Sequence, residues 1–298
     1  MSPAATPIAP PPPRPFYWSV RRELWEHRAV YLAPLAAAGV VLFGFLLSTF
    51  RLPGAVRAAA AIVDPKKAEA FMMPYSVAAL AVIVIMSVVA VFYCLAALHG
   101  ERQDRSIQFW KSLPVSDLTT VLAKFAVPAA VMPAIAFAVA MAAQVVILVL
   151  STVVVLLNGI DPNLLWKHVD LSLMWVVLPY GLLLNALWQA PVYAWLLLVS
   201  GWARRMVFIW AVAPILGLCL VEKLALNSTR LIQLLVERLL GGFGQAFSVG
   251  GKGEAPVNSF ADLDPGRVLG DPSIWIGLAF AAVFLFAAVR LRRSRDPI

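Results

Sequence analysis

The chain has 298 residues, of which 61% are hydrophobic and only 13% are charged, and its net charge is +8. A soluble globular protein carries about 25% charged residues, so this composition excludes an ordinary soluble domain. Several apolar runs reach the ~20 residues that cross a ~30 Å hydrocarbon core, and we therefore expect an all-α integral membrane protein.

The first 15 residues are rich in proline and have no apolar periodicity. This composition predicts an extended, disordered cytoplasmic tail. The remaining residues, 16–298, are expected to form a single transmembrane domain.

Residues 16–29 precede the first apolar run and predict an amphipathic helix. Tyr17, Val20 and Leu24 recur at helical spacing, with Trp18 and Trp25 seven residues apart and arginines beside them. Such a helix lies in the plane of the membrane interface. It serves either as a simple interfacial anchor or as a lever that also contacts a cytoplasmic partner.

Six transmembrane helices are predicted from apolar runs that have Arg, Lys, Trp or Pro near their ends. They lie at 30–50, 72–98, 119–157, 171–200, 205–226 and 273–291. Six helices place both termini on one side, and that side carries 14 of the 24 basic residues but only 6 of the 16 acids. By the positive-inside rule both termini are cytoplasmic, in a multi-pass protein of the cell inner (plasma) membrane.

The third apolar run, 118–157, is long enough for an alternative topology. Its 40 residues span roughly 60 Å as a helix, twice the thickness of the membrane. Splitting this run into two spans would give seven helices and would reverse the membrane orientation of every later helix. The basic-residue count alone does not exclude this topology. No Gly, Asn or Asp turn interrupts the run, and Pro128 and Pro133 kink a helix without reversing it. We therefore favour one helix, tilted or projecting outward, which packs through its alanines at i+4 spacing: Ala130, Ala134, Ala138 and Ala142.

The segment before the last span predicts an extracytoplasmic helix followed by a loop. Residues 227–247 place four leucines on one helical face, namely Leu231, Leu234, Leu235 and Leu239. The glycine-rich stretch 241–253 and the Asp/Pro-rich stretch 262–272 are typical of loops.

The charged segment between the second and third spans is the most distinctive part of the chain. Ile107, Trp110 and Leu113 recur at i, i+3 and i+6, which predicts a short helix with an aromatic face and charges of both signs around it. Such a helix is suited to binding in a groove on a soluble protein, because Trp and Arg contribute much of the binding energy at many protein interfaces. The alternative is an interfacial loop whose aromatic side chains dip into lipid. The candidate docking residues are Glu101, Arg102, Asp104, Arg105, Ile107, Phe109, Trp110 and Lys111, and Ser116 or Asp117 is expected to cap the third span.

Residues Glu101–Lys124, ERQDRSIQFWKSLPVSDLTTVLAK, resemble the coupling-helix region of ABC-2 type permeases, the membrane subunits of ABC exporters. In that family the motif also lies between the second and third spans, and the six-span count is similar. The resemblance implies a coupling helix that docks on a separate ABC ATPase dimer, and a second permease copy or paralogue. ATP and Mg would bind the partner, so this chain is expected to hold no cofactor and to bind no nucleic acid.

The substrate expected from this resemblance is exported and is a lipid, a peptide or an amphipathic small molecule, because the spans contain little charge to line an ion path. The alternative is a membrane scaffold that holds a soluble partner and transports nothing.

The sequence does not predict an enzyme. No phosphate-binding G-x-x-x-x-G-K-[ST] motif occurs, and the similar stretch at 250–253 has Ala246 and Gly253 at two required positions. An intramembrane enzyme needs ionisable or metal-binding groups at depth. The three histidines are far apart in sequence, no H-E-x-x-H is present, and Lys124 is close enough to a span end to extend to the interface. We therefore expect neither a catalytic nor a metal site.

Neutral polar residues are the remaining candidates within the spans. Gly181, Asn185, Gln189 and Tyr193 are four residues apart and form one helical stripe. The stripe either joins helices by hydrogen bonds or faces a transport pathway. The candidate pathway residues are Gln144, Asn185, Trp188, Gln189 and Tyr193.

Overall fold

The computed structural model describes residues 14–54, 56, 65–104, 115–167, 169, 171–249, 255–256, 263 and 265–294. These residues are almost entirely helical, as the sequence predicts, and six helices are long and apolar enough to cross a membrane. The candidate spans are Ala29–Gly54, Met72–Gln103, Asp117–Leu157, Leu171–Trp202, Val207–Leu226 and Pro272–Ser294. By length and composition, the protein is a multi-pass membrane protein.

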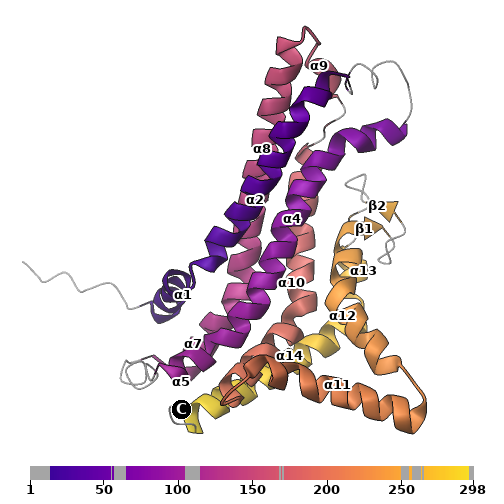
Figure 1. The fold of residues 1–298 in the computed structure, drawn as a ribbon. Coiled ribbons are helices and arrows are strands. Elements are labelled where there is room, and N and C mark those ends of the chain that lie inside the picture. Colours follow the sequence, from indigo (N-terminus) through magenta and orange to yellow (C-terminus); the bar gives the residue numbers. More distant parts are fainter. Residues whose placement is uncertain are drawn as a thin grey trace, which may run out of the picture.

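Four tall helices form the body of the molecule (Figure 1). They are α2 (Ala29–Ser48, followed by the 3-10 turn Thr49–Arg51), α4 (Pro65–Ala97), α8 (Met132–Leu157) and α10 (Leu171–Trp202). The main hydrophobic core lies between them and includes many small side chains, among them Ala78, Ala90, Ala136 and Ala140. Because alanine allows close approach of helix backbones, these small side chains favour tight packing of the four helices.

The third span is continuous, in agreement with the six-helix prediction. It consists of α7 (Asp117–Ala126), a π-helical turn (Val127–Val131) and α8. The π-helical turn lies where Pro128 lacks a backbone N–H, so the prolines change the helical hydrogen bonding without reversing the chain. Ser116 caps α7, since its Oγ accepts a hydrogen bond from the Thr119 backbone N at 3.1 Å.

The predicted packing face of this span is wrong. The positions Ala130, Ala134, Ala138 and Ala142 are exposed. The buried face instead carries Met132, Ala136, Ala140, Ala143 and Gln144. Both stripes repeat at helical spacing, so the sequence pattern alone did not distinguish them.

The second half of the chain packs against α10. Helix α14 (Pro272–Ser294) lies along the lower part of α10, and α12 (Arg230–Phe247) contacts α10 above it. Between these two helices are the paired strands β1 (Ser248–Val249) and β2 (Ala255–Pro256), which are antiparallel, and the short helix α13 (Pro265–Leu269). The predicted helix before the last span is therefore present as α12. The two stretches expected as loops are partly helical, because α12 continues through 241–247 and α13 lies within 262–272.

Helix α11 (Val207–Leu226) extends away from the bundle at its lower end (Figure 1). The chain changes direction before and after this helix at Met206 and Asn227, which both adopt left-handed backbone conformations. The Glu222 carboxylate accepts hydrogen bonds from the backbone N atoms of Arg230 and Leu231, at 3.1 and 2.9 Å. It thereby satisfies the first N–H groups of α12.

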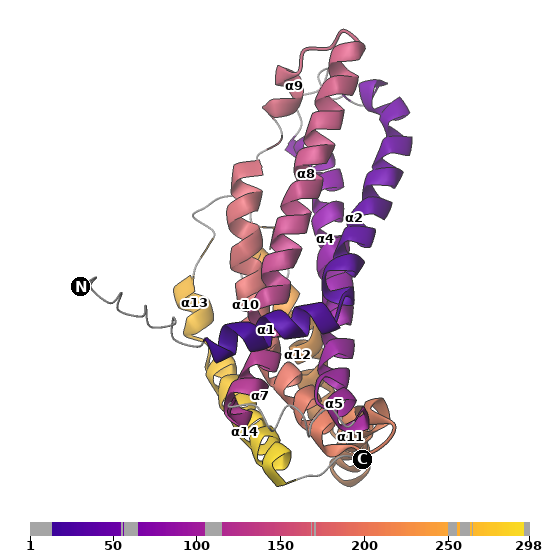
Figure 2. The ribbon, with the colours of Figure 1, turned by 90° about the vertical axis from the view of Figure 1, so that its left-hand side faces the viewer.

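Short helices lie at both ends of the bundle. At the upper end, α9 (Asn163–Trp166) follows α8. At the lower end are α1 (Pro15–Glu26) and α5 (His99–Gln103), and Figure 2 shows α1 crossing the bundle rather than running along it. Glu23 is the buried residue of α1, and Val20 and Leu24 of the apolar face expected from spacing pack against the main core, whereas Tyr17 of that face is exposed.

Candidate functional site

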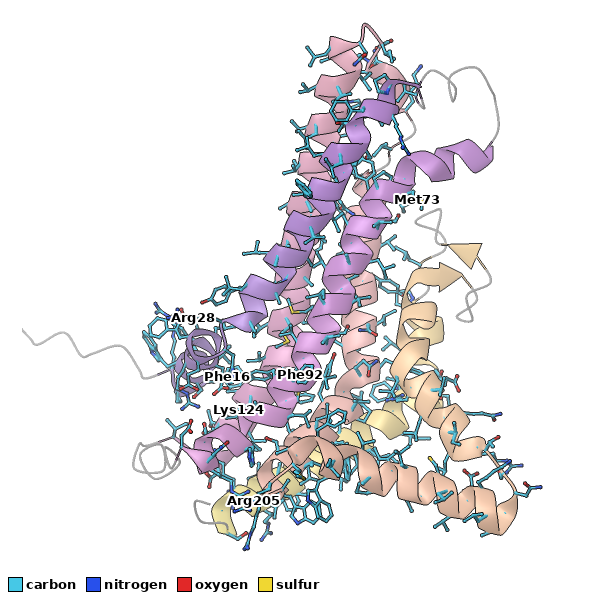
Figure 3. The ribbon with its side chains drawn as sticks, in the orientation of Figure 1. Phe16, Arg28, Met73, Phe92, Lys124 and Arg205 are labelled. Carbon is cyan, nitrogen blue, oxygen red and sulfur yellow. The ribbon has the colours of Figure 1, made fainter. Side chains whose placement is uncertain are left out.

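Six charged side chains converge at the lower end of the bundle. Lys124 of α7 is at the centre, and its Nζ lies 2.8 Å from Glu23 Oε1 and 3.1 Å from Glu101 Oε1. Figure 3 shows Lys124 close to α1. We call the whole group the loop-base network: Arg22, Glu23, Glu101, Asp117, Lys124 and Arg292.

The loop-base network balances three positive charges with three negative ones. Glu23 and Lys124 are each only 1% exposed, and Glu101 is 6% exposed. Charges this deeply buried are tolerated only when they are paired and hydrogen-bonded. The arrangement meets this condition, because each buried carboxylate has at least two cationic partners.

Helix α1 joins this network through its inward side. Glu23 accepts hydrogen bonds from Lys124 Nζ, from Arg22 Nη2 at 2.7 Å and from the Tyr93 hydroxyl at 2.9 Å. Burial by itself would raise the pKa of the Glu23 carboxyl, but the charges and hydrogen bonds of Lys124 and Arg22 outweigh it and lower that pKa. Glu23 is therefore held as a carboxylate, and α1 is attached to the second and third spans.

The network also holds both ends of the segment between the second and third spans. Glu101 lies before residues 105–114 and Asp117 lies after them. Arg292 of α14 pairs with both acids: it bonds to Glu101 Oε2, and its Nε lies 3.0 Å from Asp117 Oδ1. The two ends of this segment are thus joined to the last span by one guanidinium group.

A second set of contacts joins the same segment to α10. Arg102 donates from Nη1 to the carbonyl oxygen of Gly201 at 2.8 Å, and the Ser200 Oγ accepts from the backbone N atoms of Leu98 and His99. Cationic donors commonly satisfy the last carbonyl groups of a helix. The end of span two is therefore fixed to the end of span four.

The candidate docking residues have different environments. Glu101 and Arg102 are buried and engaged within the chain, whereas Asp104 is exposed. The other five, Arg105, Ile107, Phe109, Trp110 and Lys111, lie outside the described residues. The docking role of this segment stays a prediction.

All five candidate pathway residues are buried within this one chain. Gln144 donates from Nε2 to the Tyr75 carbonyl oxygen at 3.3 Å and accepts from Trp175 Nε1 at 3.1 Å. Trp188 and Gln189 donate to backbone carbonyl oxygens of α12, at 3.3 and 3.0 Å. In this conformation these three side chains join helices.

The remaining two candidates line a small cavity. Asn185 and Tyr193 face it from α10, opposite Met86 of α4 and Met132 of α8, and its volume is about 20 Å³. A space of this size holds about one water molecule. Asn185 and Tyr193 are therefore buried beside a small cavity between α4, α8 and α10.

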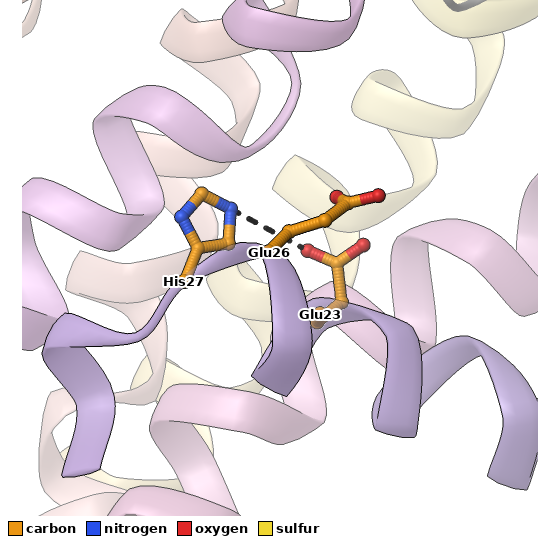
Figure 4. A group of neighbouring side chains, drawn as sticks. All are labelled: Glu23, Glu26 and His27. Atoms are coloured by element: carbon orange, nitrogen blue, oxygen red, sulfur yellow. Dashed lines mark ion pairs between the residues drawn. The ribbon is translucent and has the colours of Figure 1, made fainter.

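Glu23, Glu26 and His27 place potential metal-ligand atoms within 4.8 Å of one another (Figure 4). The chemistry of the site does not suit a cation, because Glu23 is already saturated by Lys124, Arg22 and Tyr93. His27 packs edge-to-face on Tyr93, and its Nε2 lies 3.9 Å from Glu23 Oε2. We interpret the group as part of the attachment of α1.

The loop-base network was not predicted from the sequence. Lys124 was interpreted as a side chain that extends to the interface, and Glu101 as part of a docking surface. The available signal was the acid–base composition near several span ends, but pairing partners up to 191 residues apart are set by helix packing. Comparisons with protein-family models, curated proteins and solved structures found no match.

Proposed function

We propose that this chain is the membrane-spanning permease subunit of an ABC exporter of the ABC-2 type. The observation that carries the proposal is the attachment of both ends of segment 105–114 to membrane helices. A separate ATPase subunit would dock on this segment, and two permease copies, or this chain and a paralogue, would form the translocation pathway.

The loop-base network supports this proposal because it offers a route for mechanical coupling. A movement of the segment displaces Glu101 and Asp117 and therefore pulls on Arg292 of α14 and Lys124 of α7. A buried charge left without its partner costs about 3–5 kcal/mol. Helices that would have to part while these charges stay buried therefore move together more readily than they separate. Because Arg102 and Ser200 also join the end of span two to α10, a docked ATPase would in this way drive four elements at once: α1, α7, α10 and α14.

The proposed pathway follows the stripe on α10 and requires α12 to move. Trp188 and Gln189 are covered by α12 through two hydrogen bonds to its backbone. Such bonds between membrane helices contribute only about 0.6–2 kcal/mol each, which makes this contact easier to open than the loop-base network. Amide and aromatic side chains would then line a path suited to a lipid, a peptide or another amphipathic substrate.

The experiment that tests this function is purification of the tagged chain with its partner, followed by measurement of ATP hydrolysis. Trp110→Ala should weaken assembly with a Walker-motif ATPase by about 2 kcal/mol, which is about 30-fold in affinity. Trp166→Ala is the matched control, because Trp166 is exposed at the opposite end of the bundle. Normal assembly and normal ATP hydrolysis of Trp110→Ala would contradict docking at this segment.

A membrane scaffold is the second candidate function, favoured by the small volume of the cavity along the stripe. A scaffold would bind its partner through the same segment without moving any substrate. A complex that contains no nucleotide-hydrolysing subunit would favour the scaffold over the exporter.

A further inference from the structure

Helix α1 has two chemically different sides. Its inner side carries Glu23 and His27, which face the bundle. The opposite side carries Tyr17, Trp18 and Trp25, all more than half exposed. The two acids of α1, Glu23 and Glu26, both pair with Arg22, so the outer side presents aromatic rings and positive charge without an acid.

Arg21 lies at the centre of this outer side. Its guanidinium carbon is 5.2 Å from the Trp18 ring centre and 4.8 Å from the Trp25 ring centre. Two rings therefore hold one cation by cation–π contact. Among the residues that the structure describes, Arg21 has no ion pair or hydrogen bond. Its N–H donors are thus oriented and available to an external acceptor.

The position of α1 indicates what that acceptor is. The helix ends at Glu26, and the first candidate span begins at Ala29, so α1 lies at the boundary of the membrane. It crosses the bundle (Figure 2), as a helix in the membrane plane would. Exposed Tyr and Trp side chains are typical of the headgroup level, and arginine forms paired hydrogen bonds with phosphate.

We propose that the outer side of α1 binds the headgroups of anionic phospholipids, with Arg21 contacting the lipid phosphate between Trp18 and Trp25. Arg14 and Arg28, exposed at the two ends of the helix, add positive charge that favours acidic over zwitterionic lipid. The site does not depend on the proposed transport function. It would place a lipid contact on the same short helix whose other side holds the loop-base network.

The test uses the full chain in detergent micelles and the fluorescence of its tryptophans. Brominated phosphatidylglycerol and brominated phosphatidylcholine, which quench tryptophan on contact, are titrated in parallel. The quenching that disappears in a Trp18→Phe/Trp25→Phe variant is assigned to α1. One basic residue near the surface favours anionic lipid by about fivefold. Because Arg14 and Arg28 add to the contribution of Arg21, half-quenching of α1 should require at least about fivefold less phosphatidylglycerol than phosphatidylcholine.

Arg21→Gln should reduce that preference by about fivefold, and Arg21→Lys should restore only part of the loss because lysine keeps the charge but not the planar stacking. Arg51→Gln is the matched control, with the same change in net charge at an exposed position near the other end of the first candidate span. Equal quenching of the unmodified chain by both lipids, or an unchanged preference in Arg21→Gln, would overturn the proposal. Displacement of phosphatidylglycerol by inorganic phosphate would also overturn it, because the site would then bind free phosphate.

Discussion

Replacing Lys124 by methionine tests the loop-base network most directly. The substitution keeps most of the side-chain volume but removes a cation whose Nζ lies 2.8 and 3.0 Å from the Glu23 oxygens and 3.1 Å from Glu101. Removing one partner of a buried pair typically costs about 3–5 kcal/mol. We expect the lower end, about 3 kcal/mol, because Arg22 still lies 2.7 and 2.9 Å from the same two carboxylates.

The measurement is the free energy of unfolding of the full chain in mixed micelles, followed by circular dichroism during titration with sodium dodecyl sulfate. A loss of 3 kcal/mol corresponds to a change of roughly 150-fold in the unfolding equilibrium. Lys223→Met is the matched control, because Lys223 is exposed on α11, and it should change stability by less than about 0.5 kcal/mol.

A double-mutant cycle then tests the pairing itself. Glu23→Gln removes the carboxylate charge, so Lys124→Met combined with Glu23→Gln should cost less than the sum of the two single substitutions. A coupling of about 0.5–3 kcal/mol is expected for residues in direct contact. If Lys124→Met is as stable as Lys223→Met, or if the two costs simply add, the assignment of Lys124 to a buried network is wrong.

Three further predictions follow from particular contacts. The pKa of Glu23 is lowered in the folded chain, so its contribution to stability is present above its unfolded pKa of about 4.3 and is lost as the pH falls below that value. Unfolding titrations from pH 5 to 3 should show this loss in the unmodified chain and less of it in Glu23→Gln. A Cβ at Gly242 would lie 2.7 and 2.8 Å from two side-chain atoms of α10, so Gly242→Ala should destabilise by about 1–3 kcal/mol. A Cβ at Gly241 would lie 3.2 Å from the flexible stem of Glu237 on its own helix and 4.0 Å from Trp188, so Gly241→Ala should be neutral or stabilising in the same assay. In intact cells, an impermeant thiol reagent should label Ser248→Cys and not Ser294→Cys, and labelling of the latter would support seven spans.

Much of the fold could be predicted from the sequence, since it depends on local composition. A membrane helix needs about 20 apolar residues in succession, and five of the six predicted spans contain no charged side chain away from their ends. The same reasoning predicted that 118–157 is not interrupted and that Ser116 or Asp117 caps it, and the structure has Ser116 in that role. It also predicted helix α12 before the last span, because its apolar residues repeat at helical spacing.

The side chains that meet one another were decided only by the tertiary structure. Arg22, Lys124 and Arg292 each resemble an ordinary basic flank of a membrane segment, and nothing local distinguishes them from arginines that remain exposed. They form one network because α1, α7 and α14 reach the same level at the lower end of the bundle. Likewise, the stripe on α10 is compatible with a pathway or with helix packing, and the position of α12 over Trp188 and Gln189 makes it a packing surface in this conformation. Local periodicity specifies which side of a helix is chemically distinct, whereas the partner of that side depends on helices that are distant in the chain.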